Sequence, residues 1–191
     1  MKKALLFLGI AVICAGFAFH YFRPDFSLLA DTSDGENGPI ADMDQPLPHA
    51  LLPSVGSGGW IDLSAYKGQV VLIAFWTTWC PGCVDEVPDL ISLQEQFSPK
   101  GFTVVAVAVD DQGEESVESF VRKRTFTANG ASASIIHPVF LSSDETARKL
   151  GFEGGLPAGL LVNREGREVK IIRGAVSESV LAKAIQRLLK D

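Results

Sequence analysis

Residues 70–83 read Val70-Val71-Leu72-Ile73-Ala74-Phe75-Trp76-Thr77-Thr78-Trp79-Cys80-Pro81-Gly82-Cys83. The first half of this stretch is an unbroken apolar run, which is typical of a strand buried on both faces of a sheet. The second half ends in two cysteines separated by two residues. Two thiols at this spacing in a strand-to-helix turn close and reopen a disulfide with little backbone movement. The stretch therefore predicts a redox-active dithiol at the start of a helix.

Two other uses of the cysteine pair fit the sequence less well. A structural zinc site usually has four Cys or His ligands, whereas the only other cysteine is Cys14 and the histidines are at positions 20, 49 and 137. A purely structural disulfide between Cys80 and Cys83 closes a very short loop and removes little entropy from the unfolded chain. We therefore predict no metal and no other cofactor.

The apolar patterning around this stretch predicts alternating strands and helices. We expect a second buried strand at residues 103–109, a short strand around 139–141, and a hairpin of residues 159–163 and 168–173. Helices are expected after Cys83, at 114–124, near 144–150 and at about 177–190. Strands that alternate with helices favour parallel crossover connections, and a late hairpin adds antiparallel strands. The prediction is an α/β fold with a central mixed sheet flanked by helices.

The N-terminal segment, residues 1–23, carries an export signal. Lys2 and Lys3 precede an almost unbroken apolar run from Ala4 to Phe19, which reads as a signal anchor or a signal peptide. The run approaches the roughly 20 residues that span a membrane, which favours an uncleaved anchor. Because the lysines stay in the cytoplasm, everything after Arg23 is expected on the outer side.

Residues 24–46 contain six acidic and no basic residues, interspersed with Gly and Pro. This composition predicts a flexible, solvated tether between the anchor and a working domain at residues 47–191. The formal net charge of the whole chain is −6. Nothing in this charge balance favours a nucleic-acid partner.

The order of the predicted elements, with the dithiol at a strand-helix junction, resembles the thioredoxin fold. More narrowly, the chain resembles the membrane-anchored, extracytoplasmic thioredoxin-like proteins of the TlpA/ResA type. The resemblance rests on residues 75–83, on Glu86 and Pro88, and on Gly155-Leu156-Pro157, and it covers roughly residues 50 to 190. It implies a thioredoxin-like fold and thiol-disulfide oxidoreductase activity.

The catalytic residues expected on this basis are Cys80, Cys83 and Glu86. Unpaired N–H groups and the positive dipole end at a helix start stabilise an anion, so we expect Cys80 to be the nucleophile. Cys83 then attacks the mixed disulfide and releases the reduced partner. A Glu three residues after Cys83 is ordinarily a solvated helix carboxylate, but the resemblance implies a buried proton acceptor beneath the dithiol.

The predicted substrate-binding residues are Trp79, Leu156 and Pro157. Trp79 supplies an apolar docking surface beside the dithiol. Pro157 is either an ordinary turn proline or, as the resemblance implies, the second residue of a cis peptide that faces the dithiol. In the latter case the main chain of Leu156 is available to pair with a substrate backbone.

The expected function is a thiol-disulfide oxidoreductase held by one span in the inner membrane, with its catalytic domain in the periplasm or an equivalent outer space. It is expected to reduce disulfides of exported proteins. The resemblance implies apocytochrome c or copper-site assembly proteins as substrates, and a membrane thiol transporter as the electron donor. Two alternatives remain open: a protein disulfide oxidant, and a non-enzymatic copper-binding or docking module that uses His137.

Overall fold

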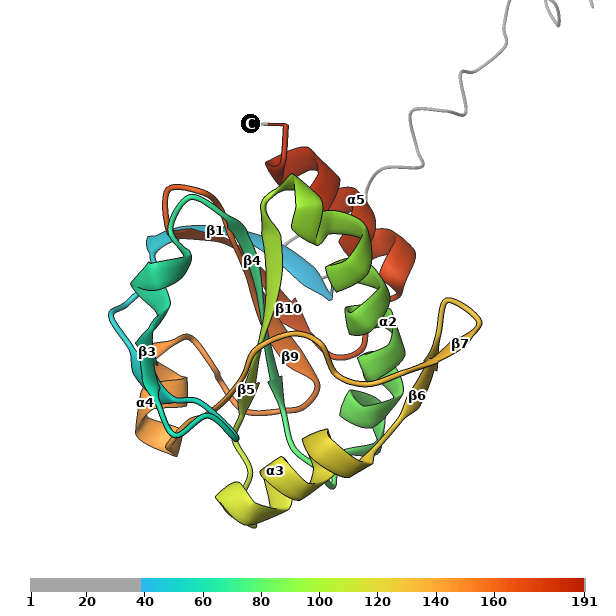
Figure 1. Cartoon of the computed structure of the whole chain (residues 1–191). Helices are drawn as coiled ribbons and strands as arrows, with labels where there is room; N and C mark the ends of the chain where they lie inside the picture. The colour runs from blue at the N-terminus through green and yellow to red at the C-terminus, as the bar shows by residue number, and fades with distance from the viewer. Residues whose placement is uncertain (1–38, 191) are drawn as a thin grey trace, which may run out of the picture. The chain divides into compact units, whose positions relative to one another are not determined.

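The computed structural model describes residues 39–190 and places the two buried strands side by side in the interior of one sheet (Figure 1). Strands β4 (Val70–Trp76) and β5 (Phe102–Ala108) run parallel, with Trp76 beside Ala108. Every residue of β5 and all but Ala74 in β4 are buried. This burial on both faces is what an unbroken apolar run predicts.

Four further strands complete the sheet in the order β1-β10-β9-β4-β5-β8. Strand β8 (Val139–Leu141) pairs parallel with β5, whereas β9 (Ala158–Val162), β10 (Arg167–Arg173) and β1 (Ile40–Pro46) pair antiparallel with their neighbours. Strands β9 and β10 form the predicted hairpin, with Gly166 in its turn at a φ of 77°. The predicted mixed sheet is confirmed.

Helices cover both faces of this sheet (Figure 1). On one face, α2 (Pro81–Phe97) and α5 (Glu178–Leu188) contribute to a shared core with β4 and β5. On the other face, α4 (Asp144–Lys149) and the 3₁₀ helix η2 (Leu63–Tyr66) pack against the alternate side chains of the same strands. The thioredoxin-like arrangement of a central mixed sheet between helices is therefore the observed fold.

The remaining elements pack around this frame. Helix α3 (Glu114–Lys123) buries Val117 in a cluster with Trp76, Cys80 and Cys83. A short 3₁₀ helix, η3, follows α2 at Ser98–Lys100. Two small hairpins consist of β2 (Leu51–Pro53) with β3 (Trp60–Asp62), and of β6 (Phe126–Ala128) with β7 (Ala131–Ala133). Neither hairpin is predicted from the sequence, because a strand of three residues shows little periodicity.

Strand β1 corrects the predicted tether boundary. Residues 40–46 belong to the tether predicted at residues 24–46, yet they pair antiparallel with β10 at the edge of the sheet. The first two residues of β1 are buried, while Asp42 forms an ion pair with Lys170 and Asp44 with Arg167. Because most side chains of this strand face solvent, its composition resembles that of a tether. The folded domain begins before residue 47, and the predicted anchor at residues 1–23 lies outside the described residues.

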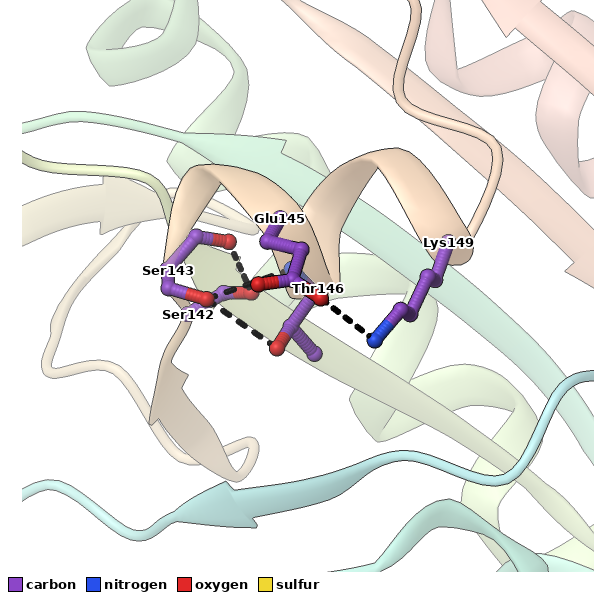
Figure 2. Close-up of polar contacts among 5 residues, drawn as sticks. All are labelled: Ser142, Ser143, Glu145, Thr146 and Lys149. Atoms are coloured by element: carbon purple, nitrogen blue, oxygen red, sulfur yellow. Dashed lines mark hydrogen bonds and ion pairs between the residues drawn. The ribbon is translucent and has the colours of Figure 1, made fainter.

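Helix α4 is short and its ends are well defined. Ser143 caps its start, where the Ser143 Oγ accepts the Thr146 N–H at 3.2 Å, as Figure 2 shows. One turn further on, Lys149 donates to Glu145 at 2.7 Å across an i,i+4 spacing (Figure 2). Such caps and pairs stabilise a helix too short to persist by propensity alone. The helix thereby fixes the position of the loop that follows it, which lies beside the dithiol.

Candidate active site

The dithiol lies at the junction of β4 and α2. Cys80 is the N-cap of α2 with extended backbone angles, and Pro81 occupies the first turn, where its missing N–H costs nothing. The Cys80 sulfur accepts the Cys83 N–H at 3.2 Å, and the two cysteines form a disulfide with their Cα atoms 5.3 Å apart. The structure thus confirms the predicted turn and shows one helix N–H directed at the Cys80 sulfur.

Two aspartates at the end of β5 hold the segment just before Cys80. The Thr78 N–H and hydroxyl both donate to one Asp110 oxygen, at 2.6 and 2.7 Å, and the Trp79 indole N–H donates to Asp111 at 2.9 Å. The carboxyl ends of adjacent parallel strands meet at one edge of a sheet, which brings these groups together. Asp110 and Asp111 are not among the predicted site residues, although their position directly after a buried strand is a signal that could have found them.

An apolar groove of about 450 Å³ opens beside Cys80. Trp79 and Leu156 line it as predicted, together with Phe152, which follows α4 and which the sequence analysis does not select. Trp79 is 53% exposed, so it offers a large apolar surface to a partner. The full lining of the groove is Thr77, Trp79, Cys80, Pro81, Val109, Asp144, Phe152, Gly154, Gly155 and Leu156.

The peptide bond between Leu156 and Pro157 is cis, which confirms that prediction. The Pro157 ring lies against α2: its Cδ is 3.4 Å from the position that a Cβ would take on Gly82. The segment before β9 is therefore in contact with the dithiol turn. A role of Leu156 and Pro157 in substrate binding stays a prediction.

A second, much smaller cavity of about 10 Å³ lies beside Cys83. Cys83 and Glu86 both line it, so the structure places the predicted acid at the same cavity as the thiol that is predicted to resolve the mixed disulfide. Ala74 of β4 also lines it and carries no polar group. The full lining is Ala74, Phe75, Trp76, Cys83, Glu86, Val87, Leu90, Ala106, Ile135 and His137.

The Glu86 carboxyl is half-buried, and one of its oxygens accepts the Val176 N–H at 3.1 Å. Burial raises the pKa of Glu86 above its ordinary value; the Val176 hydrogen bond opposes this shift, and the charge of Asp89 adds to it. A carboxyl with a raised pKa takes up a proton more readily near neutral pH. This position and this direction of shift agree with the predicted proton acceptor, and that role stays a prediction.

His137 is buried, at 5% exposure, between β7 and β8. Burial lowers its pKa to about 4, so the imidazole is neutral at physiological pH. Among residues 39–190, no group of three or more His, Cys, Asp or Glu side chains is arranged to hold a metal ion. Trp76 is likewise buried, at 6% exposure, and packs on Phe120 with ring centroids 5.3 Å apart.

Comparisons with known proteins agree with this geometry. The Redoxin family model matches residues 42–185. The thiol-disulfide oxidoreductase ResA of Bacillus subtilis is 28% identical over 184 residues, covering 94% of this chain and 91% of the relative. The thiol:disulfide interchange protein HelX of Rhodobacter capsulatus is 25% identical over 193 residues, covering 99% of this chain and 97% of the relative.

A solved structure extends the likeness to three dimensions. The thiol:disulfide interchange protein of the thioredoxin family from Chlorobium tepidum superposes with a TM-score of 0.64 at 25% identity, covering 77% of this chain and 97% of that one. The Redoxin match, the ResA and HelX likeness and the Cys80–Cys83 disulfide agree on one activity. The chain therefore belongs to the Redoxin family, as a ResA-like thiol-disulfide oxidoreductase of thioredoxin-like fold.

Proposed function

We propose that this oxidoreductase works outside the cytoplasm as a reductant of disulfides in exported proteins. In the reaction, the Cys80 thiolate attacks a partner disulfide, and Cys83 then resolves the mixed disulfide. The partner gains two electrons and leaves as a dithiol, while the enzyme becomes the Cys80–Cys83 disulfide. A membrane thiol transporter then returns the enzyme to its reduced form.

The charge distribution around the dithiol is the observation that supports the proposed direction of electron flow, from the enzyme to the partner disulfide. Among residues 39–190, no Lys or Arg lines the groove beside Cys80 or the cavity beside Cys83. The charged groups that line them or hold the neighbouring turn are carboxyls: Asp144 in the groove, Glu86 in the cavity, and Asp110 and Asp111 behind Thr78 and Trp79. Negative charges near a thiol disfavour its thiolate.

The balance between dithiol and disulfide depends on how well the reduced form is stabilised. A strongly oxidising site owes its high potential to a stabilised thiolate. Here the Cys80 sulfur accepts one backbone N–H from Cys83, and the nearby charged side chains are acidic. Because the reduced form gains little, the disulfide is comparatively stable and the potential is low, as a reductant requires.

The reduction potential tests this direction. The full chain in detergent is equilibrated with graded thiol-disulfide buffers, and thiol alkylation reports the fraction of oxidised enzyme. We expect a potential of about −250 mV or lower, which suits a reductant supplied with electrons from the membrane. A value near about −120 mV would overturn the proposal and identify an oxidant.

A charge reversal tests the electrostatic cause. Asp144 lines the groove, so Asp144→Lys is expected to stabilise the Cys80 thiolate and raise the potential by about 10 to 30 mV. Glu145→Lys is the matched control, because Glu145 is exposed and pairs with Lys149 on the surface of α4. Equal reduction potentials for the two variants would show that the charge in the groove does not set the potential of the dithiol.

The membrane location belongs to this proposal. Between residues 39 and 190, no helix has the length and apolarity needed to cross a bilayer. The predicted anchor lies in residues 1–23, and the proposed substrates are cysteines of apocytochrome c or of copper-site assembly proteins. Protease added outside intact spheroplasts should digest the catalytic domain, whereas protection until the cells are lysed would contradict the proposed location.

A further inference from the structure

Two residues that line the small cavity beside Cys83 each carry a buried polar atom to which the exchange reaction assigns no role. His137 Nδ1 and Trp76 Nε1 are both buried without a hydrogen-bond partner among the described residues. Both residues line the cavity, together with Cys83 and Glu86. Buried polar atoms are normally paired, and an unpaired one is a cost to the fold that calls for a partner.

The volume of this cavity fits one particular partner. At about 10 Å³ it is close to the least space that holds a single water molecule. A buried water typically makes two to four hydrogen bonds to polar groups that otherwise lack them. The Trp76 indole is a donor only, the Glu86 carboxylate is an acceptor, and a neutral imidazole has one nitrogen of each kind. The lining residues thus supply both donors and acceptors, as one bound water requires.

The titratable groups that line the cavity are few. Cys83 and Glu86 come from α2 and His137 from the segment before β8, while the lining residues of β4 and β5 do not titrate. Asp89 acts on Glu86 through its charge without lining the cavity. Because burial keeps the His137 imidazole neutral, the histidine suits a hydrogen-bonding role and Glu86 suits the role of proton acceptor.

We propose that His137 is a positioning residue for the resolving thiol: with Trp76, it holds a water that links Cys83 to Glu86. This inference rests on the exchange function proposed above, but it does not depend on the direction of electron flow. In the resolving step, the Cys83 thiol gives its proton through the water to the Glu86 carboxylate. The Cys83 thiolate then attacks Cys80 of the mixed disulfide, the Cys80–Cys83 bond forms, and the partner leaves as a thiolate.

The test follows a single turnover of the full chain. Reduced enzyme is mixed with a disulfide peptide over a range of pH, and acid-quenched mass spectrometry separates the mixed disulfide from the oxidised enzyme. In His137→Phe we expect the resolving step to slow by about fivefold or more and its pH inflection to move, while the first attack by Cys80 is unchanged. A wild-type resolving rate and pH profile in this variant would overturn the proposal.

Two further variants separate hydrogen bonding from packing. His137→Asn keeps a polar atom near the position of Nδ1 and is expected to recover the rate to within about twofold. If His137→Asn is as slow as His137→Phe, the hydrogen-bonding role is refuted. The matched control is His49→Phe, since the His49 side chain is 87% exposed and faces Asp62, and it should leave both steps unchanged.

A measurement on the unchanged protein covers the case in which His137→Phe does not fold. The NMR signal of the Trp76 indole N–H should show a cross-peak to a long-lived water. Its absence would overturn the proposal without any variant. An inactive wild-type chain would instead refute the exchange function, and this inference with it.

Discussion

The two sulfurs of one disulfide lie in different surroundings. Cys80 borders an apolar groove of about 450 Å³ with the exposed Trp79 on its rim. Cys83, three residues later, borders a cavity of about 10 Å³ that Glu86 and His137 also line. A single helix turn therefore separates an apolar groove that suits protein binding from a cavity whose lining includes groups that can accept or donate a proton.

This difference suggests a division of labour within the dithiol. The groove side offers apolar contact area, which is what binds a partner. The cavity side offers buried polar groups, which are what move or hold a proton. Changes on the groove side should alter which partners react, and changes on the cavity side should alter how fast the mixed disulfide is resolved.

Replacing each cysteine in turn should have the largest effect, and it tests directly whether Cys80 and Cys83 have different roles. Cys83→Ala is expected to abolish turnover and accumulate mixed disulfides through Cys80, because the resolving thiol is gone. Cys80→Ala is expected to abolish turnover without accumulating them. Non-reducing electrophoresis and mass spectrometry of cells expressing the two variants measure the trapped partners.

The outcome that contradicts this prediction is also clear. An empty trap for Cys83→Ala in cells would count against a protein-disulfide substrate. Equal trapping by both variants would show that the groove does not select Cys80 as the attacking thiol.

Removing the carboxylate beside Cys83 should have the next largest effect. Glu86→Gln is expected to slow the resolving step by about 10- to 100-fold near neutral pH, because no carboxylate then takes the thiol proton. In the wild type, the rate should fall as pH falls through the raised pKa of Glu86 and the base becomes protonated. The variant should lack that inflection.

Asp89→Asn is the control for charge alone. Asp89 raises the pKa of Glu86 by repulsion but does not line the cavity. Its removal should move the inflection toward lower pH and leave the limiting rate intact. A Glu86→Gln variant with unchanged rates would end the proton-acceptor role.

Changes in the groove should have a smaller and more selective effect. Trp79→Ala is expected to raise KM for a folded protein substrate by about tenfold, since a large exposed aromatic often dominates a contact. The rate with a small-molecule disulfide should hardly change. Trp60→Ala is the matched control, because Trp60 is 64% exposed but lies on β3, away from the groove. Equal KM values for the two variants would show that Trp79 and the groove do not contribute to partner binding.

A second carboxyl, Glu168 on β10, should affect stability alone. It is 3% exposed with an unpaired oxygen among the described residues, and burial raises its pKa to about 7. Because the folded state binds this proton more tightly than the unfolded state, stability should fall as pH rises from about 4.5 through about 7.

Glu168→Gln should remove that slope and raise the free energy of unfolding at pH 8 by about 1 to 3 kcal/mol. Urea unfolding at pH 5 and pH 8 measures the change, with the exposed Glu165→Gln as control. The exchange rate should be unaffected in both variants. If the free energy of unfolding of Glu168→Gln still falls between pH 5 and pH 8, a group other than Glu168 causes the pH dependence.

The sequence predicts best where one physical signal dominates. The apolar runs of β4 and β5 need burial on both faces, and the cysteine spacing needs a helix start, so both predictions are confirmed. Strand β1 escapes prediction because Asp42 and Asp44 face outward and pair with β10. Its pairing depends on residues more than 120 positions away, which no local pattern reports.

The site shows the same limit. The cis bond before Pro157 and the placement of Glu86 next to Cys83 follow the predicted motif. The contact of Asp111 with Trp79 and the cavity shared by His137 and Cys83 arise only when separate strands are brought together. Sequence spacing identifies the reacting atoms, whereas tertiary packing supplies the groups that surround them.

Gly82 has a consequence for how such an enzyme can be re-engineered. The dipeptide between two active cysteines is an obvious place to exchange residues when a different redox balance is wanted. Here a Cβ at position 82 would already be in van der Waals contact with the Pro157 ring, at 3.4 Å from its Cδ. A side chain at position 82 would therefore contact Pro157, so a substitution meant to change the redox balance would also change the surface next to the cis peptide.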